Sequence, residues 1–159
     1  MWSLSGRQLS WHTHVTTGMT TRATTVGLAG EFPYDDRPFS GTFLGNGHTL
    51  TANFTSTASG TGWNEQGVAP FHVIDGATIK DLTVAGTISS SSYHTAGIVG
   101  FAYGTNLIEG CTVTATLNIN NNYAGGIVGH GLSSTTTIND CVFAGTINGV
   151  GGDRANQGQ

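Results

Sequence analysis

Charged residues, cysteine, proline and long apolar runs are all scarce in this chain of 159 residues. Lysine and arginine together number 5, too few for the basic surface that neutralises nucleic-acid phosphates, so we expect no nucleic-acid partner. The chain lacks a run of about 18 apolar residues, so we expect no membrane insertion. Two cysteines are too few for a disulfide framework, which leaves the redox compartment open.

The low charge does not indicate disorder, because 37% of the residues are hydrophobic and Thr, Val and Ile recur at strand-like spacing. Thr, Ser, Asn and Gly supply the polarity instead, a profile typical of an exported β-protein. The opening segment Met1–Arg7 lacks the apolar stretch of a secretory signal peptide. We therefore expect an extracellular or cell-surface domain that is a piece of a longer protein and carries no signal of its own.

Three stretches of the chain align at a nearly constant step: Ala69–Ile88, Ile98–Leu117 and Ile127–Ile147. Apolar residues occupy the same four slots in each stretch. These columns are Ile79, Ile108 and Ile138; Leu82, Cys111 and Cys141; Val84, Val113 and Phe143; and Ile88, Leu117 and Ile147. A fixed period with aligned apolar slots is typical of stacked structural units.

Short Thr-, Val- and Ile-rich segments predict strands, with Gly, Ser and Asn at the corners between them. The expected strands are 78–84, 87–88, 97–99, 107–113, 116–119, 126–128, 137–143 and 146–147. Helix is expected to be scarce, because the repeats show no helical period. The predicted fold is an all-β, right-handed parallel β-helix (β-solenoid) with coils of about 29–30 residues, each strand lying ~4.8 Å from its counterpart in the next coil.

Alternation between inward and outward residues is interrupted once in each repeat. The interruptions fall near Lys80-Asp81, Glu109-Gly110 and Asn139-Asp140. They predict a bend or bulge at the same point of every coil.

The sequence suggests three parts: a capping segment 1–38, β-solenoid repeats 39–148 and a flexible tail 149–159. The tail is rich in glycine, which is typical of a frayed terminus. Three tryptophans outside the clear repeats are candidates for binding aromatics, and covering the first coil is the simpler role: Trp2, Trp11 and Trp63.

A weaker first repeat is visible at Pro38–Phe54. Phe39–Phe43 and Gly45–Leu50 predict a strand, a turn and a second strand. Leu50 lies one regular step before Ile79, so we expect these two residues to be neighbours in the stack.

A family resemblance rests on Ala96–Gly100 (Ala-Gly-Ile-Val-Gly) and Ala124–Gly129 (Ala-Gly-Gly-Ile-Val-Gly), each followed after eight or nine residues by an Ile and then a Cys. These segments resemble the GLUG motif, a repeat of bacterial surface proteins that include adhesin-like proteins and IgA-cleaving metalloproteases, where it lies outside the catalytic parts. Phe39–Leu50 is similar to the opening coil often found before such repeats. The first of the three aligned stretches departs from this pattern, because it has Ala69-Pro70-Phe71 where the other two have Ile-Val-Gly. The resemblance implies a scaffold rather than a reaction.

A catalytic interpretation begins with Gly129-His130-Gly131, because pectin-degrading β-helix hydrolases carry such a fragment beside clustered aspartates. Asp35-Asp36 lies more than ninety residues earlier and other elements of that family are absent, so a surface turn is the simpler interpretation. Asp81 and Asp140 share a column with a glycine between them. The resulting ~9.6 Å is at the limit for an inverting glycoside hydrolase, and solvated turn residues are favoured. We assign no catalytic residue.

Histidines offer no convincing metal site. Phe101 and His130 share a column, and one coil earlier that column holds Phe71 or His72, depending on a one-residue gap. His72 and His130 would stand two strand spacings apart, too far to share a metal ion, so an aromatic ladder is expected. His12-Thr13-His14 lacks a third ligand. We therefore expect no cofactor and no metal.

Other columns have structural interpretations. Cys111 and Cys141 are expected to be core residues, either free thiols, which we favour, or a disulfide. Lys80 and Glu109 are expected to form a surface ion pair, with Asn139 next in the same column.

Two polar columns form the candidate ligand surface. They are Thr87, Thr116 and Thr146; and Ser89, Asn118 and Asn148. The simplest interpretation is a hydrogen-bonded ladder at a corner of the solenoid, and a regular Thr array is also a candidate for ice binding. Of these residues, Thr87, Thr116, Thr146, Asn118 and Asn148 are the candidate binding residues.

The function predicted from these features is a non-enzymatic repeat module of a bacterial cell-surface or secreted protein, acting as an adhesive surface or structural stalk for a glycan or a host or cell-surface protein. The alternatives are a fragment of a carbohydrate-active β-helix enzyme, either a polysaccharide hydrolase or a lyase, and ice binding. Open ends of the stack also predict end-to-end or swapped homodimers.

Overall fold

The computed structural model describes residues 4–5, 8–9, 38–56, 68–91, 94–120 and 123–149. Within these ranges the chain forms strands and turns and no helix. The strands are β1 (Leu4–Ser5), β2 (Gln8–Leu9), β3 (Thr42–Leu44), β4 (Thr49–Ser56), β5 (Phe71–Asp75), β6 (Thr78–Lys80), β7 (Thr83–Ser90), β8 (Thr95–Ala96), β9 (Val99–Glu109), β10 (Thr112–Val113), β11 (Thr116–Ile119), β12 (Ala124–Gly125), β13 (Val128–Asn139), β14 (Val142–Phe143) and β15 (Thr146–Gly149). The predicted all-β fold class is confirmed.

Membrane-spanning helices were also not expected from the sequence. Over the same ranges, the structure contains no helix long and apolar enough to cross a membrane.

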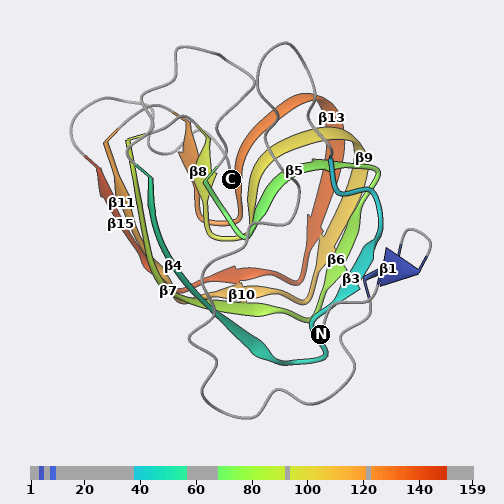
Figure 1. The fold of residues 1–159 in the computed structure, drawn as a ribbon, viewed down its shortest axis with the longest axis horizontal. Coiled ribbons are helices and arrows are strands. Elements are labelled where there is room, and N and C mark those ends of the chain that lie inside the picture. Colours follow the sequence, from blue (N-terminus) through green and yellow to red (C-terminus); the bar gives the residue numbers. More distant parts are fainter. Residues whose placement is uncertain are drawn as a thin grey trace.

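The four longer described ranges are successive repeats, which we number 1 (38–56), 2 (68–91), 3 (94–120) and 4 (123–149). Their strands pair in parallel and form curled sheets (Figure 1). One sheet, sheet A, has the order β1-β2-β3-β6-β9-β13, with β5 also paired to β9; a second, sheet B, has the order β14-β10-β7-β11-β15, with β4 also paired to β7. Strands β12 and β8 form a small third sheet. Only the pairing of β1 with β2 is antiparallel among the described strands.

Three of the four apolar columns predicted from the sequence are in register. The paired residues are Ile79–Ile108–Ile138, Val84–Val113–Phe143 and Ile88–Leu117–Ile147. All of these side chains except Ile138 belong to, or pack against, one hydrophobic core that lies between sheets A and B. Since each fully buried aliphatic side chain contributes ~1.5–3 kcal/mol before entropy, stacking stabilises repeats that would not fold singly.

The predicted bend occurs at the same point of repeats 2, 3 and 4. Strands β6, β9 and β13 end one residue before Asp81, Gly110 and Asp140, whose φ angles are 51°, 64° and 48°. These are left-handed conformations, which glycine adopts freely and aspartate tolerates better than most residues. The bend carries the chain from sheet A into sheet B.

Strands β9 and β13 are longer than the sequence predicted. The segments 100–106 and 129–136 were expected to be corners, yet both stay paired through the curve. Gly131 pairs with Ala102 and Ser134 with Gly104, so Leu132 and Ser133 oppose the single residue Tyr103. A β-bulge bends a strand without ending its pairing, so the chain turns the corner while the hydrogen bonds between β9 and β13 continue. After the bulge, the sequence separation between paired residues is one residue larger.

Asn106 stabilises this corner from inside. Its side-chain oxygen accepts a hydrogen bond from the Ala77 amide at 2.9 Å, and its amide donates to the Tyr103 carbonyl at 2.7 Å and the Thr136 hydroxyl at 3.2 Å. The side chain is buried, so these bonds compensate for lost contacts with water.

Repeat 1 differs from its predicted alignment. The structure pairs Phe43 with Ile79, and Leu50 with Val84, so the expected pairing of Leu50 with Ile79 was wrong. The predicted strand, turn and strand are present as β3, a turn at Asn46-Gly47 and β4. The step from repeat 1 to repeat 2 is longer than the regular one, because apolar side chains select the register whatever the length of chain between them.

The division into three parts stays a prediction. Gln8 in β2 pairs with Thr42 in β3, which places this part of the expected capping segment beside repeat 1. Gly149 belongs to β15, and residues 150–159 lie outside the described residues, as do the three tryptophans.

Glycines of the predicted GLUG segments allow close packing. A Cβ atom on Gly97 would collide with the Gly126 carbonyl and the Val113 side chain, and one on Gly126 would collide with the Phe143 ring. The glycine slot therefore lets the turn before β9 or β13 lie directly against the apolar column of sheet B.

Candidate functional site

The predicted ligand surface is a set of polar columns on sheet B. Thr116 pairs with Thr87 and Thr146, and Asn118 pairs with Ser89 and Asn148. Strand β4 adds a fourth row that the sequence did not reveal, since Asn53 pairs with Thr87 and Thr55 with Ser89. We call these residues the polar face: Asn53, Thr55, Thr87, Ser89, Thr116, Asn118, Thr146 and Asn148.

Side chains of the polar face bond to one another along the stack. The Asn118 amide donates to the Ser89 hydroxyl at 3.1 Å, and the Asn148 amide donates to the Asn118 side-chain oxygen at 2.9 Å. In the neighbouring column, the Asn53 side-chain oxygen accepts from the Thr87 backbone amide at 3.0 Å. The expected ladder is thus present in the column of Ser89, Asn118 and Asn148, where it fixes the rotamers of the amide groups.

The polar face is uncharged and accessible. Asn53, Thr55, Thr87, Thr146 and Asn148 are exposed, and the other three members are half-buried. It offers hydroxyl and amide groups, both donors and acceptors, in rows about 4.8 Å apart. Such a surface can hydrogen-bond an extended ligand whose own polar groups recur along its length.

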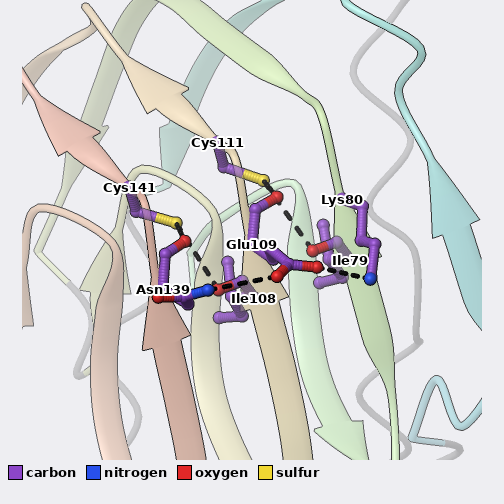
Figure 2. Close-up of polar contacts among 7 residues, drawn as sticks. All are labelled: Ile79, Lys80, Ile108, Glu109, Cys111, Asn139 and Cys141. Carbon is purple, nitrogen blue, oxygen red and sulfur yellow. Dashed lines mark hydrogen bonds and ion pairs between the residues drawn. The ribbon is translucent and has the colours of Figure 1, made fainter.

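A second ladder lies at the bend between the sheets (Figure 2). The Lys80 ammonium forms an ion pair with the Glu109 carboxylate, and the Asn139 amide donates to Glu109 Oε1 at 3.1 Å. The hydrogen bond and charge of Glu109 raise the pKa of Lys80, and those of Lys80, with the Asn139 bond, lower the pKa of Glu109. The predicted ion pair is confirmed. At this partly exposed position it favours the correct register more than it adds stability.

Both cysteines are free, as favoured from the sequence. The Cys111 thiol contacts the carbonyl of Glu109 at 3.3 Å, and the Cys141 thiol contacts that of Asn139 at 3.2 Å (Figure 2). Cys111 is buried, and burial raises its pKa to about 11. A thiol that stays protonated is a poor nucleophile, so Cys111 is a packing residue of the bend rather than a reactive group.

The structure also assembles an imidazole pair that sequence reasoning missed. His130 Nδ1 lies 3.1 Å from His94 Nε2, so one ring donates a hydrogen bond and the other accepts. The two rings stack with centroids 4.8 Å apart. Tyr123 stacks on His130, and Phe101 meets both imidazoles edge-on. The pair is therefore enclosed by aromatic rings.

Burial controls the chemistry of this pair. His94 is fully buried, and burial, reinforced by the charges of His130 and His72, lowers its pKa from 6.5 to about 3. Burial also lowers the pKa of the half-buried His130. Both imidazoles are therefore neutral near pH 7.

The expected aromatic ladder is confirmed in part. Phe101 pairs with His130, but Val73 precedes them in the column, where Phe71 or His72 was predicted. The sequence separation between paired residues is one residue smaller for β5 and β9 than for β6 and β9. The difference arises because β9 contains one extra residue after its pairing with β5, near Gly104. His94 joins from the chain before β9 and occupies the slot that Tyr123 fills one repeat later, since Thr95 pairs with Ala124. The equivalent positions of His94 and Tyr123 in the repeat were the sequence feature from which this aromatic cluster could have been found.

Catalytic and metal interpretations gain nothing from the described residues. Asp81 and Asp140 both lie at the exposed bend, in equivalent positions of repeats 2 and 4. Asp35-Asp36 and His12-Thr13-His14 fall outside the described residues. Within the part of the chain that the structure describes, no three His, Cys, Asp or Glu side chains group as metal ligands.

These features define a class: an all-β protein whose repeats pair in parallel, with apolar columns inside and polar columns outside. The chain matches no protein-family model, no curated protein and no solved structure. The GLUG resemblance therefore stays a prediction.

Proposed function

We propose that this chain is a non-enzymatic, GLUG-type β-solenoid module of a bacterial cell-surface or secreted protein, and that its polar face binds an extended glycan. The observation that carries the proposal is the in-register ladder of Ser89, Asn118 and Asn148 beside the Thr column. Ordered hydroxyl and amide groups lose little entropy when they bind a ligand.

A right-handed solenoid is supported by how the chain returns to each sheet. Repeats 2, 3 and 4 each pass through sheet A, as β5 and β6, β9 or β13, then bend at a left-handed residue and continue into sheet B. Each return adds a parallel strand beside the previous one. Crossover connections between parallel strands of one sheet are right-handed in about 98% of cases.

A glycan is the partner that suits this face best. Its eight members carry no charge, which disfavours recognition of a charged peptide or phosphate. Hydroxyl and amide rows complement the hydroxyl groups of a polysaccharide, and regular spacing along the stack suits a linear chain of repeating sugars. A surface location is in keeping with the low charge and the high content of Thr, Ser, Asn and Gly.

A panel of bacterial, plant and host polysaccharides tests the proposal, with binding and turnover measured on the same samples. We expect binding without turnover. The face variant Thr87→Ala/Thr116→Ala removes two adjacent hydroxyls, and Thr105→Ala/Thr135→Ala is its matched control, because that pair is in register on sheet A. Binding should weaken roughly 10-fold in the face variant, the effect of losing about 1.4 kcal/mol, and stay unchanged in the control.

Other outcomes identify the alternatives. Release of sugar products would support the carbohydrate-active enzyme, and thermal hysteresis lost in the face variant would support ice binding. Binding only to a host protein, or equal losses in both variants, would overturn the glycan proposal.

A further inference from the structure

Repeat 4 forms an edge of both large sheets among the described strands. Among the described strands, β13 pairs only with β9, β14 only with β10 and β15 only with β11. Over the described residues, sheets A and B therefore both end in repeat 4. An edge strand presents unpaired backbone N–H and C=O groups that can accept another strand.

Apolar side chains accompany this edge. Ile138 is 39% exposed, Leu132 43% and Val142 52%, although Ile108, the neighbour of Ile138 in the same column, is fully buried. Phe143 and Ile147 are half-buried members of the other columns. The core thus ends in partly exposed side chains rather than in a covering layer of described residues.

Strands β13, β14 and β15 have few of the features that normally keep an edge strand from pairing with another chain. No Lys, Arg, Asp, Glu or Pro occurs in β13, β14 or β15. The bulge between Gly131 and Ser134 disturbs one part of β13, and the stretch from Ser134 to Asn139 is regular. Two such edges can approach each other without repulsion between charges on these strands.

The opposite end of sheet A is different. Strand β2 pairs with β3 through Gln8 and Thr42, and β1 pairs with β2. A head-to-tail stack would bring β13 against this hairpin instead of against a free edge of β3. In sheet A this arrangement therefore favours contact between like ends.

We propose that repeat 4 binds repeat 4 of a second copy of this chain, in a two-fold dimer in which the edges of β13 and β15 pair antiparallel with their counterparts. Two-fold contacts are self-complementary and are the commonest in homo-oligomers. The arrangement buries Ile138 and closes both sheet edges in one step. It depends on the stacking of repeats and not on what the polar face binds.

Sedimentation velocity over a wide concentration range tests the dimer. We expect a concentration-dependent species of twice the 16.4 kDa chain mass that does not grow further. Ile138→Lys should weaken dimerisation roughly 10-fold or more, because the two-fold axis brings like charges together. Val142→Lys, at an outward position of the same edge, gives a second variant if the first impairs folding, as judged by circular dichroism.

Leu44→Lys is the matched control, because Leu44 is 42% exposed but lies on β3 at the other end of the stack. It should leave the dimer unchanged. Amide hydrogen exchange in β13 and β15 should slow as concentration rises, with no change in β4.

Three outcomes would overturn the inference: a strict monomer at high concentration, open-ended polymers, which indicate head-to-tail stacking, or a dimer that Leu44→Lys disrupts as strongly as the edge variants. Glycan binding is measured separately, so a failure of either proposal leaves the other testable.

Discussion

Repeats 3 and 4 are close copies in sequence and in register, yet they differ in burial. Ile108 and Cys111 are fully buried in repeat 3, whereas Ile138 is 39% exposed and Cys141 half-buried in repeat 4. The two members of each pair occupy the same slot. Repeat 3 has a neighbour on both sides and repeat 4 has one among the described residues, so stability depends on position in the stack as much as on residue type.

Truncating equivalent core residues should give the largest difference between the two repeats. Ile108→Ala should lower the free energy of unfolding by about 2–5 kcal/mol, because the cavity lies between two repeats. Ile138→Ala should cost less than half as much, since its side chain already contacts water. Urea unfolding followed by circular dichroism measures both, and equal losses would show that repeat 4 is covered in solution.

Acidification should destabilise the protein through the imidazole pair that links the two repeats. Folding lowers the pKa of His94, so the unfolded chain binds more protons at low pH. The contribution of His94 to the free energy of unfolding should be fully present above about pH 6.5 and should decrease as the pH drops toward about 3. Because one pKa unit corresponds to about 1.4 kcal/mol, the total loss should be a few kcal/mol.

The pH dependence has a direct control. His94→Phe should flatten the stability profile between these pH values, whereas Thr105→Ala, at an exposed position of sheet A, should leave its slope unchanged. Thermal unfolding at a series of pH values gives the profile. An unaltered slope in His94→Phe would show that another group causes the loss.

Adding one methyl group to the glycine slot should produce a smaller contrast. Gly97→Ala meets the Gly126 backbone and the buried Val113, so we expect a cost of about 1–3 kcal/mol from overpacking. Gly126→Ala meets the half-buried Phe143 ring, which can move toward solvent, and should cost less. The reverse order in chemical denaturation would mean that repeat 4 is packed as rigidly as repeat 3.

Thiol labelling compares the two repeats without changing their stability. Cys141 should react with a thiol reagent in the native protein, and Cys111 only after unfolding, because burial both blocks access and raises its pKa to about 11. Mass spectrometry of labelled peptides over time separates the two sites. Similar native rates for both would contradict the difference in burial.

The repeating parts of the fold were predictable because their signal is periodic. Nearly equal spacing of Ile79, Ile108 and Ile138 indicated the register, and the broken alternation at Asp81, Gly110 and Asp140 indicated the bend. Repeat 1 was misaligned because its longer step departs from that period.

The candidate site was predictable to the same extent. The sequence repeat identified the polar columns within repeats 2 to 4. It did not reveal that Asn53 and Thr55 of β4 extend these columns, because the sequence separation between repeats 1 and 2 is longer than the regular one. The contact between His94 and His130 joins different slots of two repeats, so periodic alignment did not reveal it.

By itself the sequence determined which side chains share a column and which face each column occupies, because these follow from local spacing and the two-residue period of a strand. Only the tertiary structure decided how deeply each member is buried, which histidines meet, and that repeat 4 has a paired neighbour on one side alone among the described residues. Those properties depend on neighbours on both sides and on chain paths of unequal length. A repeated local pattern of residues contains no information about a repeat's neighbours or about the length of the chain between repeats.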